Sequence, residues 1–418
     1  MTSIPPPFAV PAASRFVLAG TIVTDGQTVP DALLAVENGR IAYAGPRAEF
    51  AADGSEFADV ETTVLPIGSH ILPGLVDIHC HGGNGGDFPG GEETSARKAI
   101  DFLHRSGTTT LLASMVTASR EELLRGVELF SRLTDEGLLA GIHLEGPFLS
   151  HARCGAQNPA YLLDPDLELV TDLLAAANGH LATMTYAPEL PGAAELVDLL
   201  TSHGVIPSLG HTDSDDATSA ESLAAARTRL AAAGSDGTSQ VPTVTHLFNG
   251  MPPLHHRSPG PVAACLRLAA AGQAVVELIA DGTHLAPETV NTVFGLVGPA
   301  NIALVTDSMA AAGLSDGNYM LGPSPVTVTN GVATLDATGS IAGGTATLLD
   351  VVRRTVQTGV PLADAVLSAT AVPAGVLGLS DEVGGLRRGL RADAVVVHGD
   401  LQLAGVLRQG EWLPEFAR

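Results

Sequence analysis

Apolar runs of strand length alternate with segments of helix length through most of this chain. The segments between the runs carry the apolar spacing of amphipathic helices, and several end in glycine. Nearly continuous apolar strands that alternate with helices are typical of a parallel sheet covered on both faces. Eight such units predict an α/β fold with a closed (β/α)8 TIM-like barrel, and a doubly wound sheet is the alternative. The eight runs are 75–81, 108–116, 138–146, 181–188, 205–212, 243–249, 274–281 and 301–308.

The two ends of the chain have a different pattern. Residues 14–27, 31–45 and 392–413 consist of short apolar runs divided by turn pairs such as Asn38-Gly39. Because these ends can pair with each other, we predict a small β-sandwich domain built from residues 1–68 and 379–418, with the barrel over 69–378. Residues 326–339 predict a hairpin inserted before the last barrel helix.

Composition argues against several classes of protein. Hydrophobic residues make up 45% of the 418 positions and charged residues 16%, which is typical of a globular chain with a large core. The formal net charge is −24 with no basic stripe, so we expect neither nucleic acid nor a membrane surface as a partner. No stretch of eighteen apolar residues occurs, and residues 1–14 lack the features of a secretory signal. Three cysteines without a CxxC pair favour the reducing cytoplasm.

Polar side chains stand at the carboxyl ends of six of the predicted strands. In a barrel these ends meet at one mouth, where enzymes of this architecture build their sites. A single histidine at a strand end is usually structural, but a set of residues in the same place on successive strands indicates a functional site. The set comprises His79, His81, Glu145, His211, His246, Asp281 and Asp307.

These residue types predict a divalent metal centre. Neutral imidazoles and carboxylates suit Zn²⁺, Fe²⁺, Mn²⁺ or Co²⁺. The spacing of His79 and His81 directs both rings into the barrel, because strand side chains alternate between faces. Asp307 is the expected proton carrier, with a helix N-cap as its alternative role. The single lysine, Lys98, lies in a helical segment and cannot bridge two metals as a carboxylated lysine, which leaves Glu145 as the candidate bridge.

Ordered motifs along nearly the whole chain give a resemblance to a known family. They include LPGLVDIHCHGG, IHLEGPFL, LGHTDS, THLFNGMPPLHHRSPG, IADGTH, LVTDSMAAAG and IAGGTATLLD. The chain resembles the amidohydrolase superfamily and, within it, the N-acetylglucosamine-6-phosphate deacetylase family. The resemblance implies that Glu145, His211 and His246 bind the principal metal. It also implies that Asp307 is the catalytic acid and base, and that His79 and His81 add a second metal, giving one or two ions per subunit.

The same resemblance implies how substrate is held. Asn249, the Gly250 backbone and Arg257 match positions that bind the substrate phosphate, and Arg257 does so in the neighbouring subunit of a homodimer. An exposed loop arginine without a role is the alternative for Arg257. His284 matches a residue that contacts the sugar, and the turn containing Ala342 and Gly343 closes over it. Gln157 stands where the family has a histidine that contacts substrate, and an amide can form hydrogen bonds there but cannot carry a proton.

The implied function is hydrolysis of the acetamide of N-acetyl-D-glucosamine 6-phosphate, in amino-sugar catabolism and cell-wall recycling. Another amidohydrolase activity is one alternative, on N-acetylgalactosamine 6-phosphate or on a cyclic amide. A catalytically silent protein that binds sugar phosphates is the other, because a fold does not fix a function.

Overall fold

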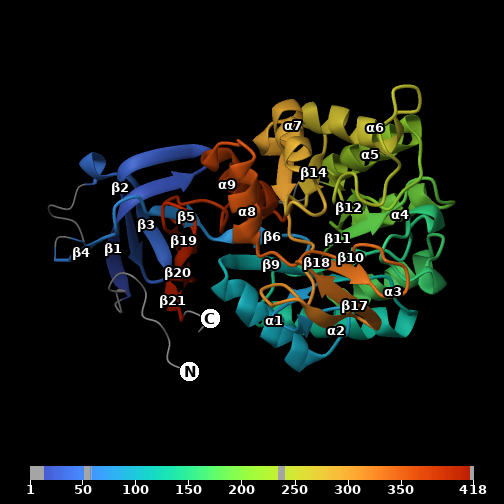
Figure 1. Cartoon of the computed structure of the whole chain (residues 1–418), viewed down its shortest axis with the longest axis horizontal. Coiled ribbons are helices and arrows are strands. Elements are labelled where there is room, and N and C mark those ends of the chain that lie inside the picture. Colours follow the sequence, from blue (N-terminus) through green and yellow to red (C-terminus); the bar gives the residue numbers. More distant parts are fainter. Residues whose placement is uncertain (1–13, 51–56, 58, 234–240, 415–418) are drawn as a thin grey trace.

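The computed structural model describes residues 14–50, 57, 59–233 and 241–414, which form a barrel and a smaller sheet beside it (Figure 1). The prediction that the first residues carry no secretory signal therefore falls almost entirely outside the described part of the chain. Figure 1 shows the blue N-terminal strands next to the red C-terminal strands, so both ends of the chain contribute to the sheet.

Eight parallel strands form the barrel in the order in which they occur along the chain. Each lies within one of the eight predicted runs, which confirms the (β/α)8 prediction. No ladder joins the first and last strands. Beyond their carboxyl ends, however, Cys80 and Ser308 form a parallel bridge, and the Asp307 N–H donates to the His79 carbonyl at 2.9 Å. The strands are β6 (Leu75–Asp77), β9 (Thr108–Met115), β10 (Gly141–Glu145), β11 (Leu181–Tyr186), β12 (Ile206–Leu209), β13 (Thr243–Val244), β14 (Val275–Leu278) and β15 (Ile302–Leu304).

Helices connect successive strands and cover the outside of the barrel. Two of them begin with reciprocal capping boxes, Ser119 with Glu122 and Thr347 with Asp350, so these starts are set by local sequence. Among the described helices, none combines the length and apolar character needed to cross a membrane. The helices are α1 (Glu93–Arg105), α2 (Arg120–Asp135), α3 (Leu167–Ala177), α4 (Ala193–Ser202), α5 (Asp216–Ala233), α6 (Gly260–Ala270), α7 (Pro287–Val297), α8 (Leu348–Gln357), α9 (Leu362–Ala369) and α10 (Ala371–Val376).

A small antiparallel sheet lies between β15 and α8 in the chain. It consists of β16 (Gly317–Leu321), β17 (Ser324–Thr329) and β18 (Val332–Leu335). The predicted hairpin is β17 and β18, joined at Asn330-Gly331, and β16 adds a third strand. The sheet packs its apolar face on residues beside the barrel mouth, including Val116 and Met309. A further short pair, β7 (Gly82–Gly83) and β8 (Gly86–Asp87), follows β6.

The strands from both chain ends form one mixed sheet. Its order is β21–β20–β19–β5–β1–β2–β3, with β4 also paired to β1. A shared core joins Phe16 and Leu34 from the first part of the chain to Val396 and Leu407 from the last, which confirms that both ends build the small domain. Its strands are β1 (Arg15–Thr24), β2 (Gln27–Glu37), β3 (Arg40–Pro46), β4 (Thr62–Val64), β5 (His70–Pro73), β19 (Ala394–Val397), β20 (Leu403–Arg408) and β21 (Glu411–Leu413). Since β5 belongs to this sheet, the sheet extends past residue 68, where we placed the boundary; the two boundaries stay predictions.

Candidate metal centre and active site

Six of the predicted polar side chains converge at the mouth of the barrel. They form two groups, and within each group the candidate ligand atoms all lie within 4.8 Å of one another. Glu145 is the last residue of β10, and the other five follow the ends of β6, β12, β13 and β15. The first group is Glu145, His211 and His246, and the second is His79, His81 and Asp307.

Glu145 lies at the centre of the first group. Its Oε1 is 2.8 Å from the Nε2 atom of His211 and 2.9 Å from that of His246. Burial alone would raise the pKa of Glu145, but hydrogen bonds from these imidazoles hold it well below its usual range. Burial would lower the pKa of His211, and its bond to Glu145 raises it instead. The carboxylate is therefore ionised and faces two imidazole nitrogens.

The second group is arranged around Asp307. Its Oδ1 is 3.1 Å from the Nε2 atom of His81 and 3.4 Å from that of His79. Burial would raise the pKa of Asp307, but the positive charge of His79 and the hydrogen bond from His81 lower it to about 2. Burial would lower the pKa of His81, which its bonds to Asp307 and Glu145 raise to about 9. Asp307 is therefore a carboxylate at neutral pH and can accept a proton.

Glu145 also connects the two groups. Its other oxygen, Oε2, lies 3.2 Å from the Nε2 atom of His81 and 3.8 Å from that of His79. One carboxylate thus presents one oxygen to each group. This is the placement expected of a residue that bridges two metals, and the bridging role of Glu145 stays a prediction.

Two of the imidazoles, His211 and His81, are oriented as metal ligands need to be. The Nδ1 atom of His211 lies 2.7 Å from the Arg153 carbonyl, and that of His81 lies 3.0 Å from the Ser114 carbonyl. A ring whose Nδ1–H donates to an oxygen can give up its Nε2 proton and offer the lone pair there to a metal, and this arrangement is usual for metal-bound histidine. Since these Nε2 atoms face carboxylate oxygens in a buried site, the residues fit a divalent cation.

Three of the six candidate ligands have left-handed backbones. The φ angles are 47° at His211, 27° at His246 and 47° at Asp307. Such conformations cost about 1–3 kcal/mol each for residues other than glycine and are concentrated at functional sites. All three come just after a strand has ended, so the backbone leaves the sheet abruptly and the side chain turns toward the mouth.

A cavity of about 220 Å³ opens over both groups. Most of the residues predicted to hold substrate line it, together with Leu321 and Ile341, which lie in and beside the small antiparallel sheet. The predicted residues in its wall are Gln157, Asn249, Gly250, His284, Ala342 and Gly343. Arg257 is not among the lining residues; it is exposed, and its guanidinium lies 2.7 Å from the Nε2 atom of the neighbouring His256.

Gln157 contacts the metal-ligand candidates directly. Its Oε1 accepts a hydrogen bond from the Thr117 N–H at 2.7 Å, which fixes the orientation of the amide. Its Nε2 donates to Glu145 Oε2 at 2.7 Å. The residue predicted to bind substrate therefore also holds the oxygen that faces the second group.

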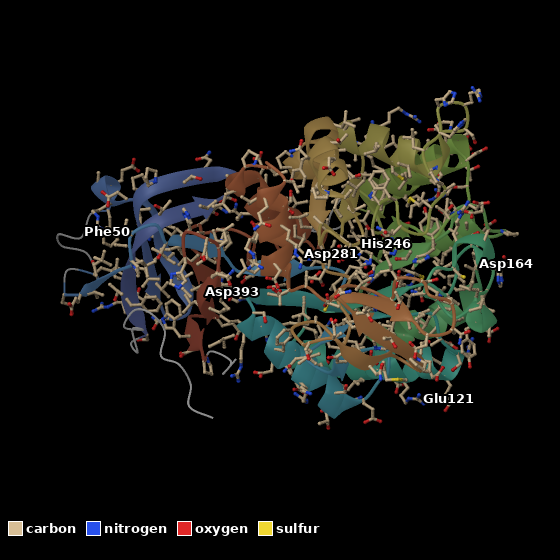
Figure 2. All side chains as sticks on the ribbon, in the orientation of Figure 1. Phe50, Glu121, Asp164, His246, Asp281 and Asp393 are labelled. Atoms are coloured by element: carbon tan, nitrogen blue, oxygen red, sulfur yellow. The ribbon has the colours of Figure 1, made fainter. Side chains whose placement is uncertain are left out.

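Two acidic residues support histidines of the site. Asp281, already noted in the sequence, lies 2.9 Å from the Nδ1 atom of His284, whose Nε2 is 3.8 Å from Asp307 Oδ2. Figure 2 labels Asp281 and His246 within the barrel. Glu277 was not predicted, although its Oε2 lies 2.9 Å from His79 Nδ1. The available signal was an acidic residue inside the apolar run of β14.

Known proteins resemble this chain along most of its length. A model of the amidohydrolase family matches residues 70–416. The N-acetylglucosamine-6-phosphate deacetylase of Bacillus subtilis is 31% identical over 397 residues, which cover 93% of this chain and 94% of that protein. An N-acetylgalactosamine-6-phosphate deacetylase of Escherichia coli is 32% identical over 346 residues, which cover 82% and 87%.

A solved structure extends the likeness to the fold. It is a mutant N-acetyl-D-glucosamine-6-phosphate deacetylase from Mycobacterium smegmatis in complex with N-acetyl-D-glucosamine-6-phosphate. It is 37% identical, with a TM-score of 0.86, and the match covers 96% of this chain and 99% of that one. The chain therefore belongs to the amidohydrolase family and, within it, to the group that contains the amino-sugar 6-phosphate deacetylases.

Proposed function

We propose that this protein hydrolyses the acetamide of N-acetyl-D-glucosamine 6-phosphate to D-glucosamine 6-phosphate and acetate. The observation that carries the proposal is Glu145, which presents one oxygen to each of two histidine-containing groups beneath the cavity. The relatives of this chain include deacetylases of this substrate, and the structure of one of them was solved with the substrate bound.

The residues of the two groups would hold one or two divalent ions, Zn²⁺, Fe²⁺, Mn²⁺ or Co²⁺. Glu145, His211 and His246 form the proposed principal position, and His79 and His81 with Asp307 the second. When bound there, a divalent ion would polarise the acetyl carbonyl and lower the pKa of water, which would supply a nucleophile at neutral pH.

Asp307 is the proposed catalytic acid and base. Asp307 is ionised at neutral pH and can take a proton from the attacking water as the water oxygen bonds to the acetyl carbon. It then returns that proton to the amide nitrogen as the carbon–nitrogen bond breaks. The products are acetic acid and the amine, which at neutral pH are acetate and the ammonium form, so the atoms balance without another reactant.

Residues around the cavity would orient the sugar. His284 is held by Asp281 and lines the wall next to Asp307, where a sugar hydroxyl or the acetyl oxygen can reach it. Asn249 and the Gly250 backbone would bind the phosphate, while Ala342 and Gly343 would cover the ring. Gln157 can offer substrate a hydrogen bond only in addition to those it makes to Glu145 and Thr117.

The substrate phosphate requires a positively charged side chain close to it, because the net charge of the chain is negative. Arg257 is exposed and lies outside the wall of its own cavity, so we propose a homodimer in which it reaches the partner's site. A guanidinium suits phosphate because its planar donors match the oxygens. We also propose a cytoplasmic location, because a charged sugar phosphate does not cross a membrane unaided.

The sugar epimer is the alternative worth testing, because an N-acetylgalactosamine-6-phosphate deacetylase is about as similar as the glucosamine enzymes. Protein stripped with a chelator and reloaded with each metal should be assayed for acetate release. The panel is N-acetylglucosamine 6-phosphate, its galactosamine epimer, unphosphorylated N-acetylglucosamine and a cyclic amide. We expect turnover of the first that depends on metal. A protein that loads metal and binds the phosphate but releases no acetate would be a binding protein instead.

The metal assignment has its own check. Glu145→Gln should lose most bound metal and nearly all activity, because Glu145 contacts both groups. His79→Ala should lose only a second equivalent. Metal analysis after gel filtration measures both, and a full metal content in Glu145→Gln would contradict the assignment.

A further inference from the structure

Glu277 is a buried acidic side chain that joins the two ligand groups. It lies on β14 and is 2% exposed. Its Oε2 is 2.9 Å from Nδ1 of His79, and the same oxygen accepts the backbone N–H of His246 at 3.1 Å. The Oε2 atom of Glu277 therefore contacts the His79 ring, which belongs to the second group, and the backbone of His246, which belongs to the first.

The bond to His79 decides which ring nitrogen is free. Of the two nitrogens, Nδ1 faces Glu277 and Nε2 faces the second group, 3.2 Å from His81 Nε2 and 3.4 Å from Asp307 Oδ1. A carboxylate that accepts from Nδ1–H fixes this tautomer and increases the basicity of the other nitrogen.

The position of His79 also depends on this bond. Its ring packs edge-on against the ring of His143, with centroids 4.5 Å apart, and is fully buried. That packing limits the plane of the ring but does not distinguish its two nitrogens, which a hydrogen-bond acceptor does.

We infer that Glu277 is a positioning residue for the second metal position: its hydrogen bond fixes the tautomer and orientation of His79, and its charge strengthens the His79 Nε2 atom as a ligand. This inference rests on the proposed two-position centre. Glu277 is not among the residues that line the cavity, so its effect should appear first in metal affinity. The second hydrogen bond, to the His246 backbone, places the same carboxylate next to the first group, and the test must therefore separate the two positions.

The chain offers a matched control. Asp281, just beyond the end of the same strand, lies 2.9 Å from Nδ1 of His284, so it forms an equivalent carboxylate–histidine pair. His284 belongs to neither ligand group. Asp281→Asn therefore removes the same type of charge close to the site without acting on His79.

The test is a titration of stripped parent and variants with Co²⁺ and Zn²⁺ in the presence of a competing chelator, with Co²⁺ absorption as a second readout. In Glu277→Gln, the amide oxygen can still accept both hydrogen bonds, but the charge is lost. We expect the second equivalent to bind about 10–100-fold more weakly, while the first equivalent and both equivalents in Asp281→Asn stay within error of the parent. In a His79→Ala background, the Glu277 change should have no further effect on metal affinity.

Several results would overturn the inference. These are an unchanged second affinity in Glu277→Gln, equal loss of both equivalents, or an effect that persists without His79. A parent that binds a single equivalent would also overturn it, yet would leave deacetylation with one metal intact. If Glu277→Gln does not fold, nitrogen NMR of the zinc-loaded parent decides, with His79 assigned from His79→Ala. A proton on Nδ1 supports the inference and a proton on Nε2 refutes it.

Discussion

Gly250→Ala tests whether the site depends on a close approach of backbone to His211, a candidate metal ligand. Gly250 has φ +62°, and a Cβ added there would lie 2.9 Å from Nδ1 of His211 and 3.3 Å from its Cα. Non-bonded atoms settle at about 3.5 Å or more, so the ring must move by roughly 0.6 Å. The ring cannot move freely, because its Nδ1 atom is hydrogen-bonded to the Arg153 carbonyl and its Nε2 atom faces the Glu145 carboxylate.

Two effects are expected and a control separates them. A left-handed alanine costs about 1–2 kcal/mol of stability wherever it is placed. Gly204 has φ +74° with nothing near its Cβ position, so Gly204→Ala should show that cost alone. Gly250→Ala should lose more stability and should also bind the first metal equivalent at least about tenfold more weakly. Its kcat should fall by about 10²-fold, because a displacement of about 1 Å at a reacting centre has effects of that size.

The assay measures unfolding by urea, affinity for the first metal equivalent, and kcat at saturating substrate for both variants. Using kcat separates displacement of His211 from weaker phosphate binding by the Gly250 backbone, which would appear mainly in KM. The reasoning is refuted if Gly250→Ala loses only as much stability as Gly204→Ala and retains the parent's metal affinity and kcat.

Three other predictions follow from the same structure. Asp307→Asn should be folded and metal-loaded but about 10²–10⁴-fold slower in kcat; a nearly normal rate would identify another proton carrier. Burial and then the charges of Arg408 and Arg391 lower the pKa of His104 to about 3, so the folded state binds fewer protons than the unfolded state below pH 6.5. Acidification from pH 7 to 5 should therefore cost the parent about 2 kcal/mol more than His104→Gln in urea unfolding, and equal losses would contradict this. Arg257→Ala should raise KM for the 6-phosphate substrate, and mixing it with Asp307→Asn should restore activity only if Arg257 acts across a dimer interface.

The barrel could be predicted from the sequence because its signals are local. Alternation of apolar runs with amphipathic segments extends over a few residues at a time, and each predicted run contains one observed strand. The runs are longer than the strands because their last residues leave the ladder. At His211 and Asp307 this happens through a positive φ, which no pattern of apolar and polar positions encodes.

The two ligand groups were also accessible from the sequence, since their members stand at the carboxyl ends of successive parallel strands. The contacts that the surrounding side chains make with these groups could not be predicted from the sequence. Gln157 was expected to face substrate, and the structure places its amide on Glu145 because the loop after β10 folds back over the mouth. Arg257 was expected at the phosphate in the neighbouring subunit, and it lies outside the cavity of its own chain; its role there stays a prediction.

The sequence alone thus determined the number and order of the strands, the end of the barrel that carries the chemistry, and the residue types there. The tertiary structure decided which carboxylate oxygen of the site faces which imidazole nitrogen. Glu277 is 198 residues from His79 and shares no motif with it, yet the two meet because β14 and β6 belong to one barrel. Such a contact depends on strand register and on the closure of the sheet, and these are set by packing of the whole chain rather than by neighbouring residues.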